Sequence, residues 1–156
     1  MNRDLQEIQL AFFRLGESLF GVDIMRIKEI ILPRKLSPLP SPSRYLEGVI
    51  TLRGSFIPVM NLARRFGMTL SPSEDTTRLL IVRYLEMVLA LEVDEVIEVI
   101  TVPVKEIKPP PDIDGIGYEY VLGVCLSGES VVMILDIDAL RDSVDCEIMP
   151  RNEIPA

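Results

Sequence analysis

One side chain in this sequence, that of Arg53, is of a type that its surroundings do not explain. Arg53 is the single cation in the otherwise largely apolar stretch from Tyr45 to Leu62. A guanidinium donates charge-assisted hydrogen bonds to acids and carbonyl groups, which makes Arg53 the first candidate for a binding residue. A solvated surface arginine is the alternative, and the stretch by itself does not separate the two.

The residue types that most enzymes need are missing from this sequence. Its 156 residues include no histidine, which excludes imidazole catalysis, histidine metal ligation and histidine phosphotransfer within this chain. No nucleophile beside a base, metal-ligand cluster or phosphate-binding glycine loop is recognisable. Cys125, in an apolar strand pattern, and Cys146, in an acidic segment, are interpreted as buried or incidental thiols. We therefore expect no catalytic activity and no cofactor.

The composition is that of a folded protein of one domain, or of two very small ones. Hydrophobic residues make up 48% of the chain and charged residues 26%, which argues against disorder. The formal net charge of -8 disfavours binding to nucleic acid or to an anionic membrane. No apolar run is long enough to span a membrane, and the acidic N-terminus lacks the apolar core of a signal peptide. We therefore expect a cytoplasmic protein.

The elements that would position Arg53 are a hairpin and a short helix. Val49–Leu52 and Phe56-Ile57 contain strand formers, and Gly54 permits the chain reversal between them. Asn61 can then cap a helix over 62–66.

The segments ahead of this hairpin predict a second hairpin and, less clearly, helical turns. Ile8–Leu15 and Leu19–Val22 alternate in the manner of paired strands. Isoleucines recur at helical spacing in 24–31, but the segment is too short to assign. A short helix is predicted near 42–47, with Gly48 at its end.

The second half of the chain repeats the residue pattern of the first. Residue classes match when residue 12 is placed on residue 81 and, after an insertion, when Gly48 is placed on Gly123 and Asn61 on Asp136. The repeat predicts an all-β fold with short helices, in which two five-stranded units each close into a small barrel. The predicted ranges are a domain at 8–142, barrels at about 8–70 and 78–142, a third helix at 137–142, and flexible tails at 1–7 and 143–156.

The repeat also separates residues that the fold requires from residues that are free to specialise. Gly48/Gly123, Tyr45/Tyr120 and Asn61/Asp136 recur, and we assign them mainly to turns, packing and capping. Arg53 falls opposite Gly128, so the barrel geometry does not demand an arginine at this position.

Two segments of the sequence resemble the CheW family. Phe13–Ile24, continued by Ile27–Ile30, is similar to the opening of that family, and Gly48–Leu62 looks like its signature. The resemblance extends from Ile8 to about Asp142. It implies two SH3-like five-stranded barrels with a hydrophobic groove between them. It also implies a stand-alone, non-enzymatic adaptor, monomeric in isolation, that couples chemoreceptors to a CheA-type histidine kinase in a membrane-associated signalling array.

The resemblance also implies which residues contact each partner. Receptor binding is expected at Ile27, Glu29, Gly48, Arg53, Val93, Val96 and Val99. The contact with the CheW-like regulatory domain of the kinase is expected at Leu46, Glu47 and Phe56. A second array contact is expected at Lys108, Asp112 and Ile113.

Several of these residues have a structural alternative. Ile27, Ile30, Val96 and Val99 have the spacing of core residues, although a groove floor can pack beneath and bind above. Glu29 recurs as Glu98, which favours a shared structural hydrogen bond over a role in receptor binding. Two other functions stay open: an adaptor in a chemosensory-like pathway with a non-motility output, and a small-molecule-binding β-barrel protein.

Overall fold

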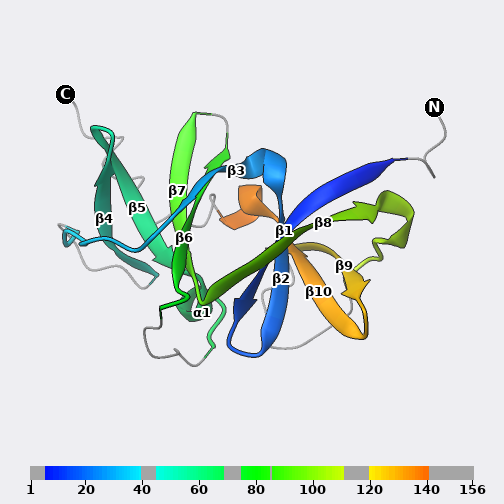
Figure 1. Cartoon of the computed structure of the whole chain (residues 1–156). Helices are drawn as coiled ribbons and strands as arrows, with labels where there is room; N and C mark the ends of the chain where they lie inside the picture. The colour runs from blue at the N-terminus through cyan, green and yellow to red at the C-terminus, as the bar shows by residue number, and fades with distance from the viewer. Residues whose placement is uncertain (1–5, 40–44, 69–74, 85, 111–119, 141–156) are drawn as a thin grey trace.

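The computed structural model describes residues 6–39, 45–68, 75–84, 86–110 and 120–140 (Figure 1). Within these ranges the chain forms ten strands in two five-stranded sheets, which we name after β1 and β6. In spatial order, the β1 sheet contains β8 (Glu95–Pro103), β1 (Glu7–Leu15), β2 (Ser18–Asp23), β10 (Ser130–Leu135) and β9 (Val121–Ser127). The β6 sheet contains β3 (Ile27–Ile31), β6 (Arg78–Tyr84), β7 (Met87–Val93), β5 (Ser55–Asn61) and β4 (Leu46–Leu52). The predicted all-β class with two five-stranded units is confirmed.

Short helices connect some of these strands. They are η2 (Ile24–Arg26), α1 (Leu62–Arg65), η3 (Val104–Glu106) and one turn over 137–140. The caps predicted for two of them are confirmed, because Asn61 Oδ1 accepts a hydrogen bond of 3.0 Å from Arg64 N, and Asp136 Oδ1 one of 3.2 Å from Ala139 N. Residues 141–142, at the end of the third predicted helix, lie outside the described residues.

One helical prediction is wrong, and a segment left unassigned is mostly a strand. Leu46 and Glu47 belong to strand β4, in which Leu46 is opposite Met60, so the predicted helix near 42–47 is not formed at these two residues. Residues 42–44 lie outside the described ranges. In 24–31 only η2 is helical, whereas Ile27–Ile31 is strand β3, because β6 provides its backbone with a hydrogen-bonding partner. A tertiary pairing has overridden the local spacing in both segments.

The two halves of the chain exchange strands: β1 and β2 of the first half join β8, β9 and β10 of the second, and β6 and β7 of the second half join β3, β4 and β5 of the first. β3, from the first half, pairs with β6 of the second, and β8, from the second half, pairs with β1 of the first (Figure 1). Each sheet therefore contains strands from both halves. The expected barrels at about 8–70 and 78–142 are corrected accordingly, and Glu7, expected in a flexible tail, begins β1. Residues 1–5 and 143–156 lie outside the described ranges.

The register of the strands follows the sequence repeat. Phe12 pairs with Glu98 in the β1 sheet, and the equivalent residue Ile81 pairs with Glu29 in the β6 sheet. In both sheets the register of the strand pair shifts directly after this residue. The parallel pairs agree as well, since β2 runs beside β10 as β7 runs beside β5. The exchange is thus an internal two-fold arrangement in which every strand has a counterpart in the other sheet.

Each sheet is closed into a barrel by the segment that follows one of its edge strands, β3 or β8. Ser37, after β3, exchanges two backbone hydrogen bonds of 2.8 Å with Val49 in β4, and Lys108, after β8, exchanges two of 2.9 Å with Val124 in β9. A Cβ atom at Gly48 would lie 2.5 Å from the Ser37 carbonyl oxygen, and one at Gly123 would lie 2.8 Å from that of Lys108. Gly48 therefore does not end a helix. Both glycines are required because a backbone segment crosses directly above them.

The largest core lies between the two sheets. Its rings form a series from Phe13 to Phe20 to Phe66 to Tyr120, with successive centroids 5.8, 5.5 and 6.1 Å apart. Two smaller cores fill the individual barrels, one against β4–β7 and one against β1, β8, β9 and β10. Separating the sheets would expose the largest of the three clusters to water, so the strand exchange and the central core stabilise the same arrangement.

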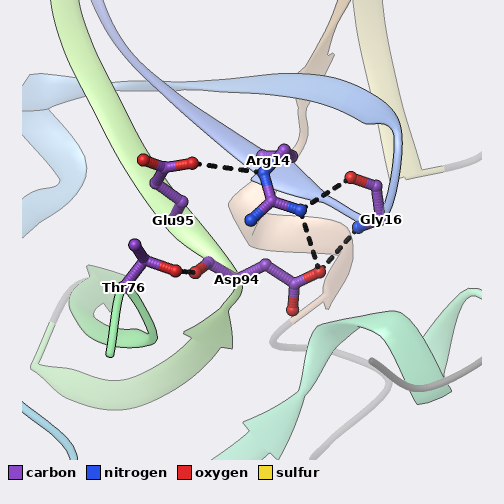
Figure 2. A network of polar contacts seen from close by, with 5 residues as sticks. All are labelled: Arg14, Gly16, Thr76, Asp94 and Glu95. Carbon is purple, nitrogen blue, oxygen red and sulfur yellow. Dashed lines mark hydrogen bonds and ion pairs between the residues drawn. The ribbon is translucent and has the colours of Figure 1, made fainter. Parts of the chain in front are cut away.

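A polar network fixes the point at which the chain passes from one sheet to the other (Figure 2). Asp94, between β7 and β8, accepts a hydrogen bond of 2.6 Å from Gly16 N in the β1–β2 turn. Arg14 contacts Asp94 at 3.8 Å and Glu95 at 3.2 Å, and donates to the Gly16 carbonyl at 2.9 Å. Thr76 Oγ1 donates to the Asp94 carbonyl at 2.7 Å. These contacts hold the start of β8 against β1.

We predict that Gly48→Ala and Gly123→Ala each destabilise the protein by ~1–3 kcal/mol, because the new methyl group must displace a backbone carbonyl. Urea unfolding of the two variants measures the effect. Gly21→Ala is the control, since a Cβ atom there would meet its nearest neighbour at 3.4 Å. Equal stability of all three variants would contradict the role assigned to the crossing segments.

Candidate partner-binding site

Arg53 lies in the turn between β4 and β5 and forms a two-pronged ion pair with Glu29 of β3. Arg53 Nη2 is 3.0 Å from Glu29 Oε1, and Nη1 contacts Oε2. The Arg53 side chain is nevertheless 68% exposed, whereas that of Glu29 is 23% exposed. Hydrogen bonding to Arg53, with the charge of Arg53, lowers the pKa of the Glu29 carboxyl despite its partial desolvation. The carboxylate therefore orients a guanidinium that stays open to solvent.

This ion pair lies at one end of the seam that closes the β6 barrel. The seam begins at the Ser37–Val49 pair, continues where Arg34 Nη1 donates to the Thr51 carbonyl at 3.0 Å, and ends at Glu29 and Arg53. In the other barrel, the pair Lys108–Val124 is equivalent to Ser37–Val49. The residue equivalent to Arg53 in that barrel is Gly128. Closure of a barrel therefore does not depend on the arginine.

The backbone of Arg53 supports the same conclusion. Its φ of 51° is in the left-handed region, and it is the one non-glycine residue with positive φ in the part of the chain that the structure describes. The equivalent turn residue in the other half, Gly128, has a φ of 63°. A side chain is unfavourable in this conformation, which glycine adopts freely. An arginine here is thus retained against the local backbone preference, as strained residues at functional sites are.

The expected shared hydrogen bond of Glu29 and Glu98 is not formed in the same way. Glu29 is bound by Arg53, whose counterpart is Gly128, so Glu98 has no equivalent arginine to accept from. The Glu29 carboxylate is instead part of the Arg53 site.

The other residues expected to bind the receptor differ in their accessibility. Val93 is fully buried in the central core and Gly48 is buried beneath residues 36–37, so neither presents a surface for a partner. Ile27 and its equivalent Val96 are half-buried and pack against the central core. Val99 is exposed. Receptor binding by Ile27, Val96 and Val99 stays a prediction. Their partial burial is compatible with side chains that pack against the core on one side and contact a partner on the other.

The residues expected to bind the kinase separate in a similar way. Leu46 is 4% exposed and belongs to the central core, so, contrary to expectation, it presents no surface to the kinase. Phe56 is 78% exposed on β5, opposite Thr51. Glu47 is half-buried and points one carboxyl oxygen into the protein.

The second array contact is only partly described. Lys108 is exposed and closes the β1 barrel through its backbone. Asp112 and Ile113 lie outside the described residues, so this contact stays a prediction.

Two features of the surface and of the sheet junction were missed by the sequence reasoning. The outer face of the β9–β10 hairpin exposes Leu122, Leu126 and Val131, and the repeat places the last two opposite Thr51 and Phe56. At the junction, the Arg65 guanidinium carbon lies 4.3 Å from the ring centroids of both Tyr45 and Tyr120. The recurrence of this tyrosine was the available signal, and the cation–π contacts explain it.

The described residues provide little for cofactor or metal chemistry. Among them, no group of three or more acidic or cysteine side chains is arranged to hold a metal ion. Cys125 is buried, and burial, followed by the charge of Glu106, raises the pKa of its thiol, as expected of an unreactive cysteine. Cys146 lies outside the described ranges. None of the helices in these ranges combines the length and apolar character needed to cross a bilayer.

The two closed barrels with exchanged strands define a class of all-β proteins built from two paired five-stranded barrels. A family model for the CheW-like domain matches residues 9–145, and the chain belongs to this family. It is 35% identical over 147 residues to the chemotaxis protein CheW of Treponema pallidum, covering 91% of this chain and 86% of that protein. It is 30% identical over 142 residues to the probable chemotaxis protein CheW of Rhizobium etli, covering 89% and 90%. The crystal structure of the scaffolding protein TtCheW from Thermoanaerobacter tengcongensis matches with a TM-score of 0.80 and 31% identity, covering 85% and 86% of the two chains.

The strain at residue 53 predicts an unusual order of stability. Arg53→Gly should be more stable than Arg53→Ala by about 1 kcal/mol, because both variants lack the ion pair and only alanine opposes the left-handed backbone. Urea unfolding of the two variants tests this. The same pair of changes at Arg83, within strand β6, should give the opposite order. A more stable alanine variant at residue 53 would contradict the prediction.

Proposed function

We propose that this protein is a non-enzymatic adaptor that couples chemoreceptors to a CheA-type histidine kinase. The observation that carries the proposal is the Arg53 turn, in which an exposed guanidinium is oriented by Glu29 on a backbone that would suit glycine. Family membership supports it, as do relatives described as chemotaxis proteins and a structural relative described as a scaffolding protein. Such an adaptor works by binding two partners at once and needs no cofactor.

The proposed receptor contact centres on Arg53. Glu29 occupies one side of the guanidinium, which leaves donors on its exposed side for carbonyl or carboxylate oxygens at the tip of a receptor's helical hairpin. Pre-orientation by Glu29 reduces the entropy that a long side chain would otherwise lose on binding. Val99 and the outer sides of Ile27 and Val96 would supply the apolar part of this contact.

The proposed kinase contact centres on Phe56. An exposed aromatic side chain on a strand is a typical anchor at the centre of a protein interface. A CheW-like domain of the kinase could pair with this barrel pseudo-symmetrically, because the two domains are homologous. Glu47 and the second array contact at Lys108, Asp112 and Ile113 belong to this proposal as well. We place the adaptor in the cytoplasm, recruited to membrane-associated receptor arrays, and as a monomer in isolation.

Arg53→Ala should weaken binding to a soluble fragment of the receptor tip by about ten- to a hundredfold, because charge-assisted hydrogen bonds are lost. Isothermal titration calorimetry gives the affinity, and thermal melts of the same samples should show little change. Arg53→Gly should bind as weakly as Arg53→Ala, while Arg83→Ala, which removes another exposed arginine, should bind normally. Unchanged affinity for Arg53→Ala would reject the receptor role, and loss of the folded state would assign the arginine to the fold.

Phe56→Asp should weaken kinase binding at least about tenfold, since it places an unpaired charge in a desolvated contact. The side chain is exposed, so the variant should remain folded. Val131→Asp is the matched control, because it introduces the same charge at the equivalent exposed position of β10. Pull-down with the kinase regulatory domain shows whether the contact involves Phe56 on β5 or Val131 on β10. If only Val131→Asp reduced binding, the contact would lie on the β9–β10 hairpin instead.

A further inference from the structure

Glu47 occupies an unusual place in the β6 sheet. Leu46 pairs with Met60 and Gly48 pairs with Val59, so Glu47 is the extra residue of a β-bulge near the start of β4. Its Oε1 atom is enclosed and accepts no hydrogen bond from a backbone amide, a hydroxyl group or a cationic side chain of the described residues. An enclosed carboxylate oxygen without a donor is costly, and a proton on or beside the carboxyl group reduces that cost.

A second carboxyl group lies in the same sheet, on the other side of β5 from the bulge. Glu92 is half-buried in β7, where it pairs with Asn61 of β5 and Leu79 of β6. Burial, then hydrogen bonding to Glu47, raises the pKa of Glu92 to about 8. The Glu92 carboxyl therefore binds a proton at neutral pH, when an ordinary glutamate is ionised.

The other charged groups around Glu92 do not reverse this effect. The negative charges of Glu47 on β4 and of Asp94 at the β7–β8 junction both raise its pKa, and Arg64 of α1 is the cation that lowers it. The Asp94 carboxylate is itself bound by Arg14 and by Gly16 N. Two carboxyl groups in such contact cannot both ionise without strong repulsion.

The fold does not require an acidic pair at this place. The equivalent bulge in β9 is occupied by Leu122, because Val121 pairs with Leu135 and Gly123 with Ile134. The counterpart of Glu92 is Asp23, which caps η2 by accepting a hydrogen bond from Met25 N. The comparison between the two halves thus separates the pair Glu47–Glu92 from barrel geometry, as it separates Arg53.

We propose that the protonated carboxyl group of Glu92 donates a hydrogen bond to the enclosed carboxylate of Glu47, and that this contact forms a pH-sensitive latch between the β4 bulge and β7. At neutral pH the proton on Glu92 joins the two side chains and holds the start of β4 in the sheet. When the proton is lost at alkaline pH, two carboxylates repel each other across the bulge, and the first residues of β4 loosen. The opposite end of β4 carries the Arg53 turn.

The direction of the pH effect follows from proton binding. The folded protein holds a proton that the unfolded chain releases near the ordinary glutamate pKa of 4.5. The stability contributed by the pair is therefore complete below pH 4.5 and is lost as the pH rises through about 8. Within this window the pair alone makes the unfolding equilibrium constant rise by up to about tenfold per pH unit.

The first test is a direct titration of the side-chain carboxyl carbons by NMR in the intact protein. Glu92 should titrate near pH 8, and amide protection at 46–48 should fall through the same range after correction for intrinsic exchange. A Glu92 midpoint near 4.5 would overturn the proposal, whatever the stability of any variant.

The second test compares urea unfolding at pH 5.5, 6.5 and 7.5 for the wild type, Glu92→Gln and Glu98→Gln. Glutamine removes the titration while keeping the shape, so Glu92→Gln should lose the part of the pH dependence that comes from the pair, up to about tenfold per unit. Glu98 is exposed on β8, and its variant should keep the slope of the wild type. Equal slopes for the wild type and Glu92→Gln would overturn the proposal, and the carboxyl titration decides the matter if Glu92→Gln does not fold.

Discussion

The exchange of strands between the two halves is the constraint on which the rest of this structure depends. Each barrel takes two strands from one half and three from the other, so neither half can complete a sheet alone. The aromatic series from Phe13 to Tyr120 then fills the space between the sheets. Arg65, held between Tyr45 and Tyr120, adds cation–π contacts to one tyrosine from each half. Pairing, burial and charge thus all oppose separation of the halves.

The exchange also explains where specialised residues can be placed. Positions at which a backbone crosses closely, such as Gly48 and Gly123, are filled identically in both halves because a Cβ atom would collide with a carbonyl. Positions on turns and outer faces carry no such restriction. Arg53 and Gly128, Glu47 and Leu122, and Phe56 and Val131 occupy equivalent backbone sites with different chemistry. Two similar barrels can in this way form an adaptor for two different partners, because a binding side chain can be present in one barrel and absent from the equivalent position of the other.

The Arg53 turn combines three separate properties. Its backbone is in a conformation that glycine adopts more readily, its guanidinium is bound by a carboxylate from another strand, and most of the side chain remains exposed. Because an exposed ion pair contributes little to stability, the contact with Glu29 is better understood as a means of orienting a donor than as a means of holding the barrel closed.

The sequence by itself determined the local and repeated features of this protein. Turn glycines, the caps at Asn61 and Asp136, the internal repeat and the exceptional character of Arg53 all follow from residue types at short range or from comparison of the two halves. The tertiary structure alone decided which strands pair, and with them which side chains are buried. Alternation shows that successive strand residues face opposite sides, but the side that is covered depends on a partner far away in the chain. Leu46 and Val93 are therefore core residues while Phe56 is exposed, 27–31 is a strand because β6 lies beside it, and Glu47 meets Glu92 only because β4 and β7 both flank β5.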